Sequence, residues 1–218
     1  MSNNTRPLRV LMIHGYRQNA SSCREKSGAF RKLTKRHIDP VFISAPLVVP
    51  SKPDEANSAA DERGWWFSGA DDSFSAGQQS ELCRGFEASL ATVRAAALEH
   101  APIDGVLGFS QGAALVGLLC ALQQRGELDW TFRFAILVAG FRSRSMPHAK
   151  LYEESITLPT LHVFGDTDRV IPKEMSEDLL KCYTDAAVLN HSGGHHIPAT
   201  SKDKGVYLEF LDRMRLQC

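Results

Sequence analysis

Residues 105–115 constrain the fold of this chain more than any other stretch. They read Gly-Val-Leu-Gly-Phe-Ser-Gln-Gly-Ala-Ala-Leu, an apolar run followed by Gly-x-Ser-x-Gly around Ser110 and then by small residues. This order is typical of a nucleophile elbow, a buried strand that turns so sharply into a helix that the positions beside the serine must lack side-chain bulk. Such a turn lifts the serine hydroxyl clear of the sheet. Because glycine is common, the short motif alone is a modest signal, and its meaning depends on the rest of the chain.

Apolar runs and helical patterns alternate along the rest of the sequence. Strands are predicted at residues 8–13, 40–44, 105–109, 132–138, 160–164 and 187–189. The first helix is expected to begin with a capping box of Ser22 and Glu25, and further helices are predicted near residues 80–99, 111–124, 172–183 and 201–216. This alternation predicts an α/β fold with a mostly parallel central sheet and helices on both faces. In such sheets, ligands bind beyond the carboxyl ends of the strands.

One segment, residues 47–79, interrupts the alternation. It has no helical or strand periodicity and is punctuated by proline and glycine. A loop of this length in a compact domain is usually disordered or functional, and the run Trp65, Trp66 and Phe67 argues against disorder because aromatic side chains need burial. We therefore expect a lid-like insertion. The three aromatic residues either belong to the core or line a substrate pocket.

The overall composition restricts the class of protein. A chain of 218 residues fits a single domain spanning residues 1–218. Lys plus Arg and Asp plus Glu number 25 each, so no basic excess points to a nucleic-acid partner. The polar start does not resemble a signal peptide, and a buried strand and helix account for the apolar run at residues 106–122. We expect no stable membrane anchor.

Cysteine and histidine usage adds two further expectations. The five cysteines are scattered, odd in number and form no Cys-x-x-Cys, which fits a reducing compartment and a cytoplasmic protein. Histidines and carboxylates do not recur at metal-ligand spacing, so we expect no metal and no other cofactor. The composition leaves the oligomeric state open.

A serine hydroxyl is a weak nucleophile, so the elbow needs partners elsewhere in the chain. An imidazole must accept the hydroxyl proton, and a carboxylate must orient that imidazole. In α/β-hydrolases the three groups occur in the order Ser, Asp or Glu, His. This sequence supplies Ser110, Asp168 and His195 in that order, each in a glycine-containing loop after a predicted strand. The pattern predicts an α/β-hydrolase fold with a catalytic triad.

Two of these assignments have an alternative beside them. Asp166 lies in the same loop as Asp168, but it directly follows Gly165, where an aspartate commonly bonds its own local backbone. His196 lies next to His195, and we favour His195 because the two preceding glycines would let it approach Ser110 closely.

The oxyanion of an acyl-transfer reaction also needs two backbone N–H donors. One comes from the residue after the nucleophile, here Gln111, and the other from the loop after an early strand, where Tyr16 follows His14-Gly15. We expect His14 to be a buried imidazole that braces this loop rather than a catalytic group.

Several blocks together give the chain a close resemblance to a known family, the family of serine hydrolases. They are the first strand with His14-Gly15-Tyr16-Arg17-Gln18-Asn19, then Arg63-Gly64-Trp65-Trp66-Phe67, Gly108-Phe109-Ser110-Gln111-Gly112, His162–Asp168 and His191-Ser192-Gly193-Gly194-His195. The resemblance covers essentially the whole chain, with a departure at His196, where an aromatic residue is expected. It implies an α/β-hydrolase fold, the same triad and esterase activity with a preference for longer acyl chains.

The residues and the resemblance together predict a serine carboxylesterase acting on a small-molecule or lipid-like ester with a medium-to-long acyl chain. An acyl thioesterase or acyl-protein deacylase is the alternative enzyme, because the same triad serves both reactions. A non-catalytic binding protein on the same fold is the alternative of another class. It is less favoured because all three triad residues are present.

Overall fold

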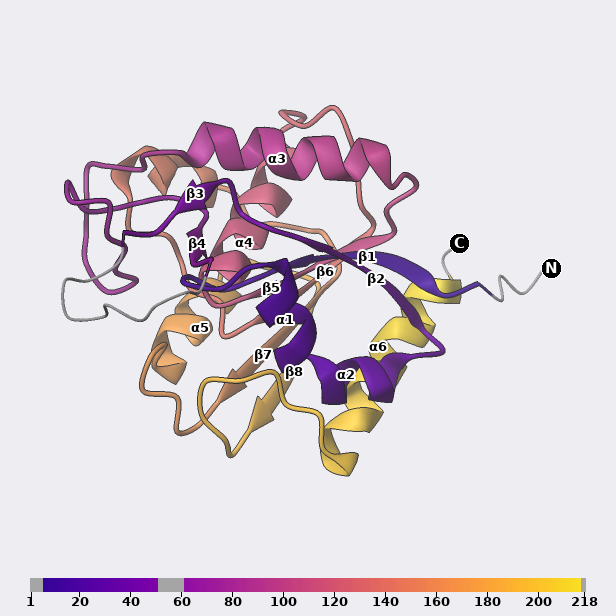
Figure 1. Cartoon of the computed structure of the whole chain (residues 1–218). Coiled ribbons are helices and arrows are strands. Elements are labelled where there is room, and N and C mark those ends of the chain that lie inside the picture. The colour runs from indigo at the N-terminus through magenta and orange to yellow at the C-terminus, as the bar shows by residue number, and fades with distance from the viewer. Residues whose placement is uncertain (1–5, 51–60, 217–218) are drawn as a thin grey trace.

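A single parallel sheet forms the centre of the molecule. The computed structural model of the chain describes residues 6–50 and 61–216. Six strands lie in the order β2-β1-β5-β6-β7-β8, and each neighbouring pair is parallel (Figure 1). Their bounds are β1 Leu8–Ile13, β2 Ile38–Ile43, β5 Gly105–Phe109, β6 Phe134–Val138, β7 Thr160–Gly165 and β8 Ala186–His191. The α/β class with a parallel central sheet, predicted from the sequence, is confirmed.

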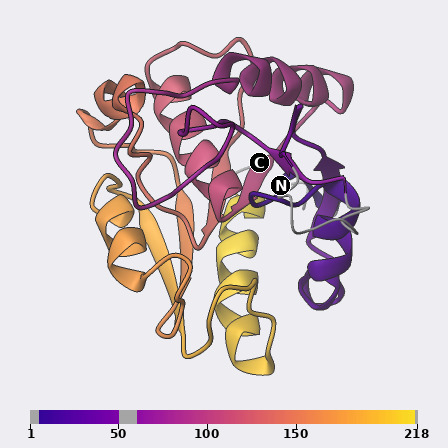
Figure 2. The same cartoon turned by 60° about the vertical axis from the view of Figure 1, so that its left-hand side comes forward.

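Helices cover both faces of this sheet. They are α1 Ala20–Lys26, α2 Gly28–Thr34, α3 Phe86–Glu99, α4 Gln111–Gln124, α5 Lys173–Leu180 and α6 Ser201–Leu216, with a short 3-10 helix η1 at Met146–Tyr152. Figures 1 and 2 place α3 and α6 on opposite sides of the molecule. The helices α2 and α6 pack against each other through Phe30 and Tyr207, whose rings are 5.1 Å apart.

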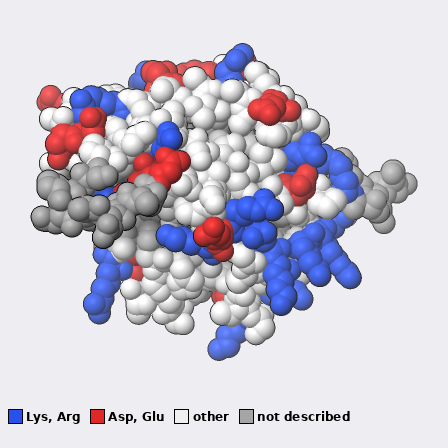
Figure 3. Space-filling model, in the orientation of Figure 1, with Lys and Arg blue, Asp and Glu red and all other residues white. Residues whose placement is uncertain are grey.

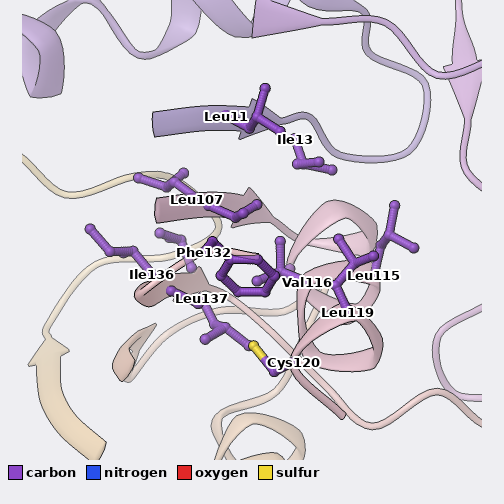
Figure 4. Packing of buried hydrophobic residues seen from close by; sticks show 14 of the residues in the cluster. Leu11, Ile13, Leu107, Leu115, Val116, Leu119, Cys120, Phe132, Ile136 and Leu137 are labelled. Atoms are coloured by element: carbon purple, nitrogen blue, oxygen red, sulfur yellow. The ribbon is translucent and has the colours of Figure 1, made fainter. Parts of the chain in front are cut away.

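The core is densest where α4 crosses β5 and β6. All residues of both strands are buried, as are residues 111–122 of α4, so this helix is enclosed on all sides rather than amphipathic. Figure 4 shows Leu115, Val116 and Leu119 of α4 facing apolar residues of the sheet and of the segment before β6. Gly105 makes room for the Phe134 ring, which would lie 2.3 Å from a Cβ at that position.

The strand order places a topological switch point beside β1. After β1 the chain forms β2 on one side, whereas β5 lies on the other side of β1. The connections leave in opposite directions there, which is the position at which open α/β sheets bind ligands. Ile13 of β1 pairs with Gly108 of β5, so the loop at His14 and the turn at Ser110 are neighbours at this point.

The beginning of the first helical region differs from the prediction. The N-cap of α1 is Asn19, whose side chain accepts a hydrogen bond from the Ser22 N–H, while the Ser22 hydroxyl accepts one from the Asn19 N–H. A capping box based on Ser22 and Glu25 was therefore wrong, because the preceding asparagine already satisfies the helix terminus. The region also contains two helices, α1 and α2, instead of one.

The irregular insertion differs from the prediction in two ways. It ends just before Phe86 instead of at residue 79, and it contains two short strands. Helix α3 begins at Phe86 instead of residue 80, because the backbone of Arg84 exchanges two hydrogen bonds with Phe67 and Gly85 has a φ of 81°. Near the start, β3 Leu47–Val48 pairs antiparallel with β4 Arg63–Gly64. Of the predicted lid, residues 51–60 lie outside the described residues.

The surface is mixed in charge, with one basic concentration. Lys and Arg side chains gather over α2 and the neighbouring part of α6, including the exposed Lys32, Lys35 and Arg36 (Figure 3). A net charge of zero therefore conceals a local basic area, and the expected absence of a nucleic-acid partner stays a prediction. Within residues 6–50 and 61–216, no helix has the length and apolar character needed to cross a bilayer.

Candidate active site

Ser110 occupies a strained turn between β5 and α4. Its φ and ψ are 55° and −119°, a conformation that costs free energy for a residue with a Cβ. The flanking glycines are required, because a Cβ on Gly108 would lie 2.4 Å from the Gly112 carbonyl oxygen and one on Gly112 would lie 2.3 Å from the Ile13 carbonyl oxygen. The Ser110 side chain does not cap α4, so the helix does not use its hydroxyl.

Asp168 and His195 form a pair in which the carboxylate is buried and the imidazole is half-buried. The Asp168 Oδ2 lies 2.7 Å from Nδ1 of His195, and the two side chains are 2% and 18% exposed. The other carboxylate oxygen, Oδ1, accepts hydrogen bonds of 2.8 Å from the backbone N–H groups of Val170 and Ile171. With both oxygens occupied, the carboxylate is fixed, and it holds the imidazole in one orientation.

The pair lies beside the elbow. The ring of His195 packs against the ring of Phe109, the residue before Ser110, with 4.7 Å between the centroids. Ser110 follows β5, Asp168 follows β7 and His195 follows β8, so three loops at the carboxyl edge of the sheet supply the three side chains. The structure thus brings the three residues predicted for the triad to one place.

Asp166 is held elsewhere, although the reason differs from the one expected. Its Oδ1 pairs with Lys173 Nζ and with Asn190 Nδ2, each at 3.0 Å, on the exposed side of the loop. The expectation that Asp166 bonds its own local backbone was wrong, because Asp168 makes those local bonds through Oδ1. The Asp168 carboxylate therefore both bonds its local backbone and holds His195, because its two oxygens have different partners.

Gly165 of the acid loop and Gly193 of the histidine loop both lie where a side chain would clash. A Cβ on Gly165 would lie 2.2 Å from the Gly193 carbonyl oxygen, and one on Gly193 would lie 2.5 Å from the His196 ring. These glycines therefore let the acid loop and the histidine loop pack tightly against each other. His196 is exposed, and its ring lies 5.0 Å from that of His191, away from the pair with Asp168.

The loop after β1 approaches the serine closely. A Cβ on Gly15 would lie 3.3 Å from the Ser110 Cβ and 3.1 Å from the Phe109 ring, so this loop passes directly over the elbow. The N–H of Gln111 belongs to the first residue of α4 and has no intrahelical acceptor. Tyr16 follows Gly15, and its ring packs over Gly64 and against Phe74 at 5.4 Å. Both predicted oxyanion donors therefore lie in segments next to Ser110.

His14 is a buried, neutral brace for the same loop. Its Nε2 accepts a hydrogen bond from the Ala45 N–H, so Nδ1 carries the proton and donates to the Gly15 carbonyl at 2.7 Å. Burial lowers the pKa of His14 from 6.5 to about 4, outweighing the hydrogen bond to Gly15 that raises it. The imidazole is neutral at physiological pH and holds the loop from both ring nitrogens.

The aromatic run is buried beneath this loop. Trp65, Trp66 and Phe67 are 0%, 1% and 5% exposed. Trp65 donates its indole N–H to the His14 carbonyl at 2.8 Å, and the ring of Trp66 packs edge-on against Phe74 at 5.1 Å. These contacts make Trp65 and Trp66 supports of the site, and a substrate-lining role for the three residues stays a prediction.

The sequence did not reveal the contacts of the Gln111 side chain. Only its backbone N–H was assigned a role, yet its amide accepts from the Trp65 N–H at 2.9 Å and donates to the Trp66 carbonyl at 2.8 Å. A signal was available, because Gln111 is a polar residue at the first position of a long buried apolar helix. In the described ranges no three His, Cys, Asp or Glu side chains gather to hold a metal, and the expected absence of a metal remains a prediction.

A parallel sheet with a strained serine after β5 and a hydrogen-bonded Asp–His pair after β7 and β8 defines the class of α/β-hydrolase enzymes. The family model described as serine hydrolase (FSH1) matches residues 1–207. The chain belongs to this family, and it is a hydrolase. Among its relatives is a protein named Esterase OVCA2 from Danio rerio, 52% identical, in an alignment that covers 96% of this chain and 98% of that protein.

Solved structures with lower identity share the fold. Esterase PE8 superposes with a TM-score of 0.65 at 22% identity, covering 97% of this chain and 94% of that one. Acyl-protein thioesterase 2 from Zea mays superposes with a TM-score of 0.65 at 20% identity, covering 99% and 96%. Both proteins are esterases or thioesterases by name, and their likeness to this chain establishes the α/β-hydrolase fold.

Proposed function

We propose that the chain is a carboxylesterase that works through an acyl-enzyme, with Ser110 as nucleophile, His195 as general base and Asp168 as the group that orients it. The observation that carries the proposal is the 2.7 Å contact between Asp168 and His195, with the His195 ring packed on the residue before Ser110. A carboxylate–imidazole pair beside a strained serine is the arrangement that activates a hydroxyl.

In this reaction Ser110 Oγ bonds to the ester carbonyl carbon while its proton passes to Nε2 of His195. Asp168 keeps the proton on Nδ1 and stabilises the imidazolium. The N–H groups of Tyr16 and Gln111 donate to the oxyanion, and each is expected to contribute about 3 kcal/mol. The bond to the alcohol then breaks as His195 protonates the leaving oxygen. A water molecule, deprotonated by the same histidine, attacks the acyl-serine and releases the acid.

Ser110→Ala tests the nucleophile. Wild-type protein is expected to react with a fluorophosphonate probe and to hydrolyse p-nitrophenyl esters, and the variant is expected to do neither. Equal labelling of the variant would refute the assignment of Ser110. An unlabelled, unreactive wild type would instead support the non-catalytic alternative, a binding protein on the same fold.

We further propose that the acyl group is medium to long. The half-buried Phe74 supports this, because it bridges Tyr16 of the loop over the serine and Phe141 after β6, with ring centroids 5.4 Å and 6.1 Å away. An aromatic side chain in this position offers an apolar wall to an alkyl chain. A p-nitrophenyl ester series should show kcat/KM rising from acetate to decanoate, and a preference for acetate would contradict the proposal.

A thioesterase is the second candidate, because a thioesterase from Zea mays shares the fold. The triad accepts an oxygen or a sulfur leaving group, so paired substrates with the same acyl chain decide between them. A higher kcat/KM for the oxygen ester, after correction for intrinsic reactivity, supports the carboxylesterase, and a marked preference for the thioester supports the alternative.

We also propose that residues 1–218 form one catalytic domain, that the partner is a small-molecule or lipid-like ester and that the protein is cytoplasmic. Cys23, Cys83, Cys120 and Cys182 are free thiols, as a reducing compartment would leave them. Burial raises the pKa of Cys23 and Cys120 to about 12, so these two thiols stay protonated and unreactive. Fractionation of cells that express the protein tests the location.

A further inference from the structure

The side-chain amide of Gln111 ties the elbow to a segment far away in the sequence. Its Oε1 accepts from the Trp65 N–H at 2.9 Å, and its Nε2 donates to the Trp66 carbonyl at 2.8 Å. Both partners are backbone groups of fixed polarity, so only an amide in this orientation satisfies them. Gln111 is fully buried, which makes each unmet hydrogen bond costly.

Trp65 extends this connection to the loop after β1. Its indole N–H donates to the His14 carbonyl at 2.8 Å, and its ring lies 5.0 Å from the His14 ring. His14 in turn holds the Gly15 carbonyl and the Ala45 N–H. Helix α3 holds the peptide between Trp65 and Trp66, since the Ser89 hydroxyl donates to the Trp65 carbonyl. An unbroken set of contacts therefore joins the Gln111 amide to the residues just before Tyr16.

We propose that the Gln111 side chain is a positioning residue for hydrolysis, which sets the separation of the two oxyanion donors by holding the Trp65-Trp66 backbone between the elbow and the loop after β1. The inference rests on the proposed function, because the two donors are the N–H groups of Gln111 and Tyr16. Their spacing matters chiefly when the carbonyl oxygen becomes charged and moves into the hole. Loss of the amide is therefore expected to lower kcat while leaving KM nearly unchanged.

The other end of α4 supplies a matched control. Gln123 makes the same pair of contacts, accepting from the Phe132 N–H at 2.8 Å and donating to the Phe132 carbonyl at 3.0 Å. Gln124 does so as well, with Thr157 and Ser155. Glutamine side chains of this helix thus repeatedly pair with backbone groups of another segment. Of these three, only Gln111 holds a segment that contacts the loop beside Ser110.

The test compares Gln111→Glu and Gln111→Leu with Gln123→Glu and Gln123→Leu. The leucine variants remove both hydrogen bonds, and the glutamate variants keep the acceptor but lose the donor. For each, kcat and KM on a p-nitrophenyl ester, the melting temperature and the Ki of a trifluoromethyl ketone are measured. That ketone adds to the serine and places an oxyanion at the position where the transition state has one.

For the Gln111 variants we expect kcat to fall about 10- to 100-fold, KM to stay within about threefold, and the ketone Ki to rise as kcat falls. For the Gln123 variants we expect a lower melting temperature with kcat and Ki within about twofold of wild type. Folded Gln111 variants with wild-type kcat, or with a raised KM alone, would overturn the proposal. So would an equal loss of kcat in the Gln123 variants.

Ser89→Ala keeps the test decisive if the Gln111 variants do not fold. It removes one hydrogen bond to the Trp65 carbonyl and adds no bulk. We expect kcat to fall about 3- to 10-fold at constant KM, and an unchanged kcat would contradict the proposal. The two ways to fail are distinguishable. If the proposed function is wrong, wild type does not react with a fluorophosphonate. If only the positioning role of Gln111 is wrong, wild type still reacts.

Discussion

Two buried carboxylates lie at opposite ends of the sheet and have opposite consequences. Asp168 follows the carboxyl end of β7, and Asp104 precedes the amino end of β5; their side chains are 2% and 6% exposed. Asp168 holds His195, an imidazole of the kind that transfers protons in general acid–base catalysis. Asp104 holds Arg6 and Arg133, whose charge is permanent, and accepts from the Arg9 N–H at 2.7 Å.

The comparison teaches that burial and full hydrogen bonding do not by themselves mark a catalytic carboxylate. Burial alone raises the pKa of Asp104, but the hydrogen bonds from Arg6, the Arg9 N–H and Arg133 outweigh it and leave the pKa below its ordinary value. Asp104 therefore stabilises the fold at the amino end of β5. Asp168 follows the carboxyl end of β7, its partner His195 packs beside the elbow, and an imidazole can transfer a proton.

The largest expected effect comes from changing Asp168, and it is an effect on catalysis. Asp168→Asn keeps a carbonyl oxygen for the Val170 and Ile171 N–H groups, so the protein should stay folded. The imidazole would adopt the wrong tautomer, and kcat for ester hydrolysis should fall about 10⁴-fold. Asp166→Asn is the control and should leave kcat within about threefold, since its carboxylate faces Lys173. The reverse result would move the acid to Asp166.

The pH dependence of unfolding should separate the histidines from Asp104. Burial lowers the pKa of His14 and His148 from 6.5 to about 4 and that of His162 to about 3. Between pH 6.5 and 4 the unfolded chain binds protons that the folded chain does not, so stability falls as the pH falls through this range. Each histidine contributes a loss on the order of 3 kcal/mol by pH 4.

Asp104 acts in a lower window. Its folded pKa lies below 3.8, so its stabilising effect is present above that pH and is lost only as the pH falls further. Urea unfolding at pH 7, 5.5 and 4.5 should therefore show the effect of the histidines with little contribution from Asp104, and His162→Phe should flatten the slope. A free energy of unfolding that stays constant from pH 6.5 to 4 would contradict the assignment.

Asp104→Asn should act on stability and spare activity. Removing the charge abolishes the ion pairs of Asp104 with Arg6 and Arg133, and the free energy of unfolding should fall by about 2 kcal/mol. The figure is below that of a fully buried pair because Arg6 and Arg133 are 45% and 34% exposed. Urea unfolding measures the loss, and kcat at a temperature well below the melting point should match wild type. A fall in kcat of tenfold or more would show that Asp104, at the amino end of β5, affects the site at the carboxyl ends of the strands.

The smallest expected effect comes from Gly15→Ala in the loop beside Ser110. The new Cβ would lie 3.1 Å from the Phe109 ring and 3.3 Å from the Ser110 Cβ, so the loop must shift by a few tenths of an ångström. We expect kcat to fall about tenfold. Gly205→Ala in α6 is the control, because no atom lies within 4 Å of its Cβ and the helix should gain about 0.5–1 kcal/mol. An unchanged kcat for Gly15→Ala would show that the loop tolerates displacement.

Local rules account for the parts of the fold that were predictable. The run before Ser110 is uniformly apolar and the run after it is helical, so a buried strand and a buried helix followed from residues that are neighbours in sequence. The start of α3 was missed because it depends on Arg84 pairing with Phe67, a partner from the irregular segment. Periodicity carries no information about such a contact.

The sequence by itself determined the α/β architecture, the glycine-flanked turn at Ser110 and the chain order of the loops that carry Asp168 and His195, because sterics and periodicity act between near neighbours. Only the tertiary structure decided that Asp168 rather than Asp166 meets His195, and that the Gln111 amide holds Trp65 and Trp66. Those choices depend on which loops pack together. A side chain's partner is then set by a few ångströms of three-dimensional geometry that no local pattern records.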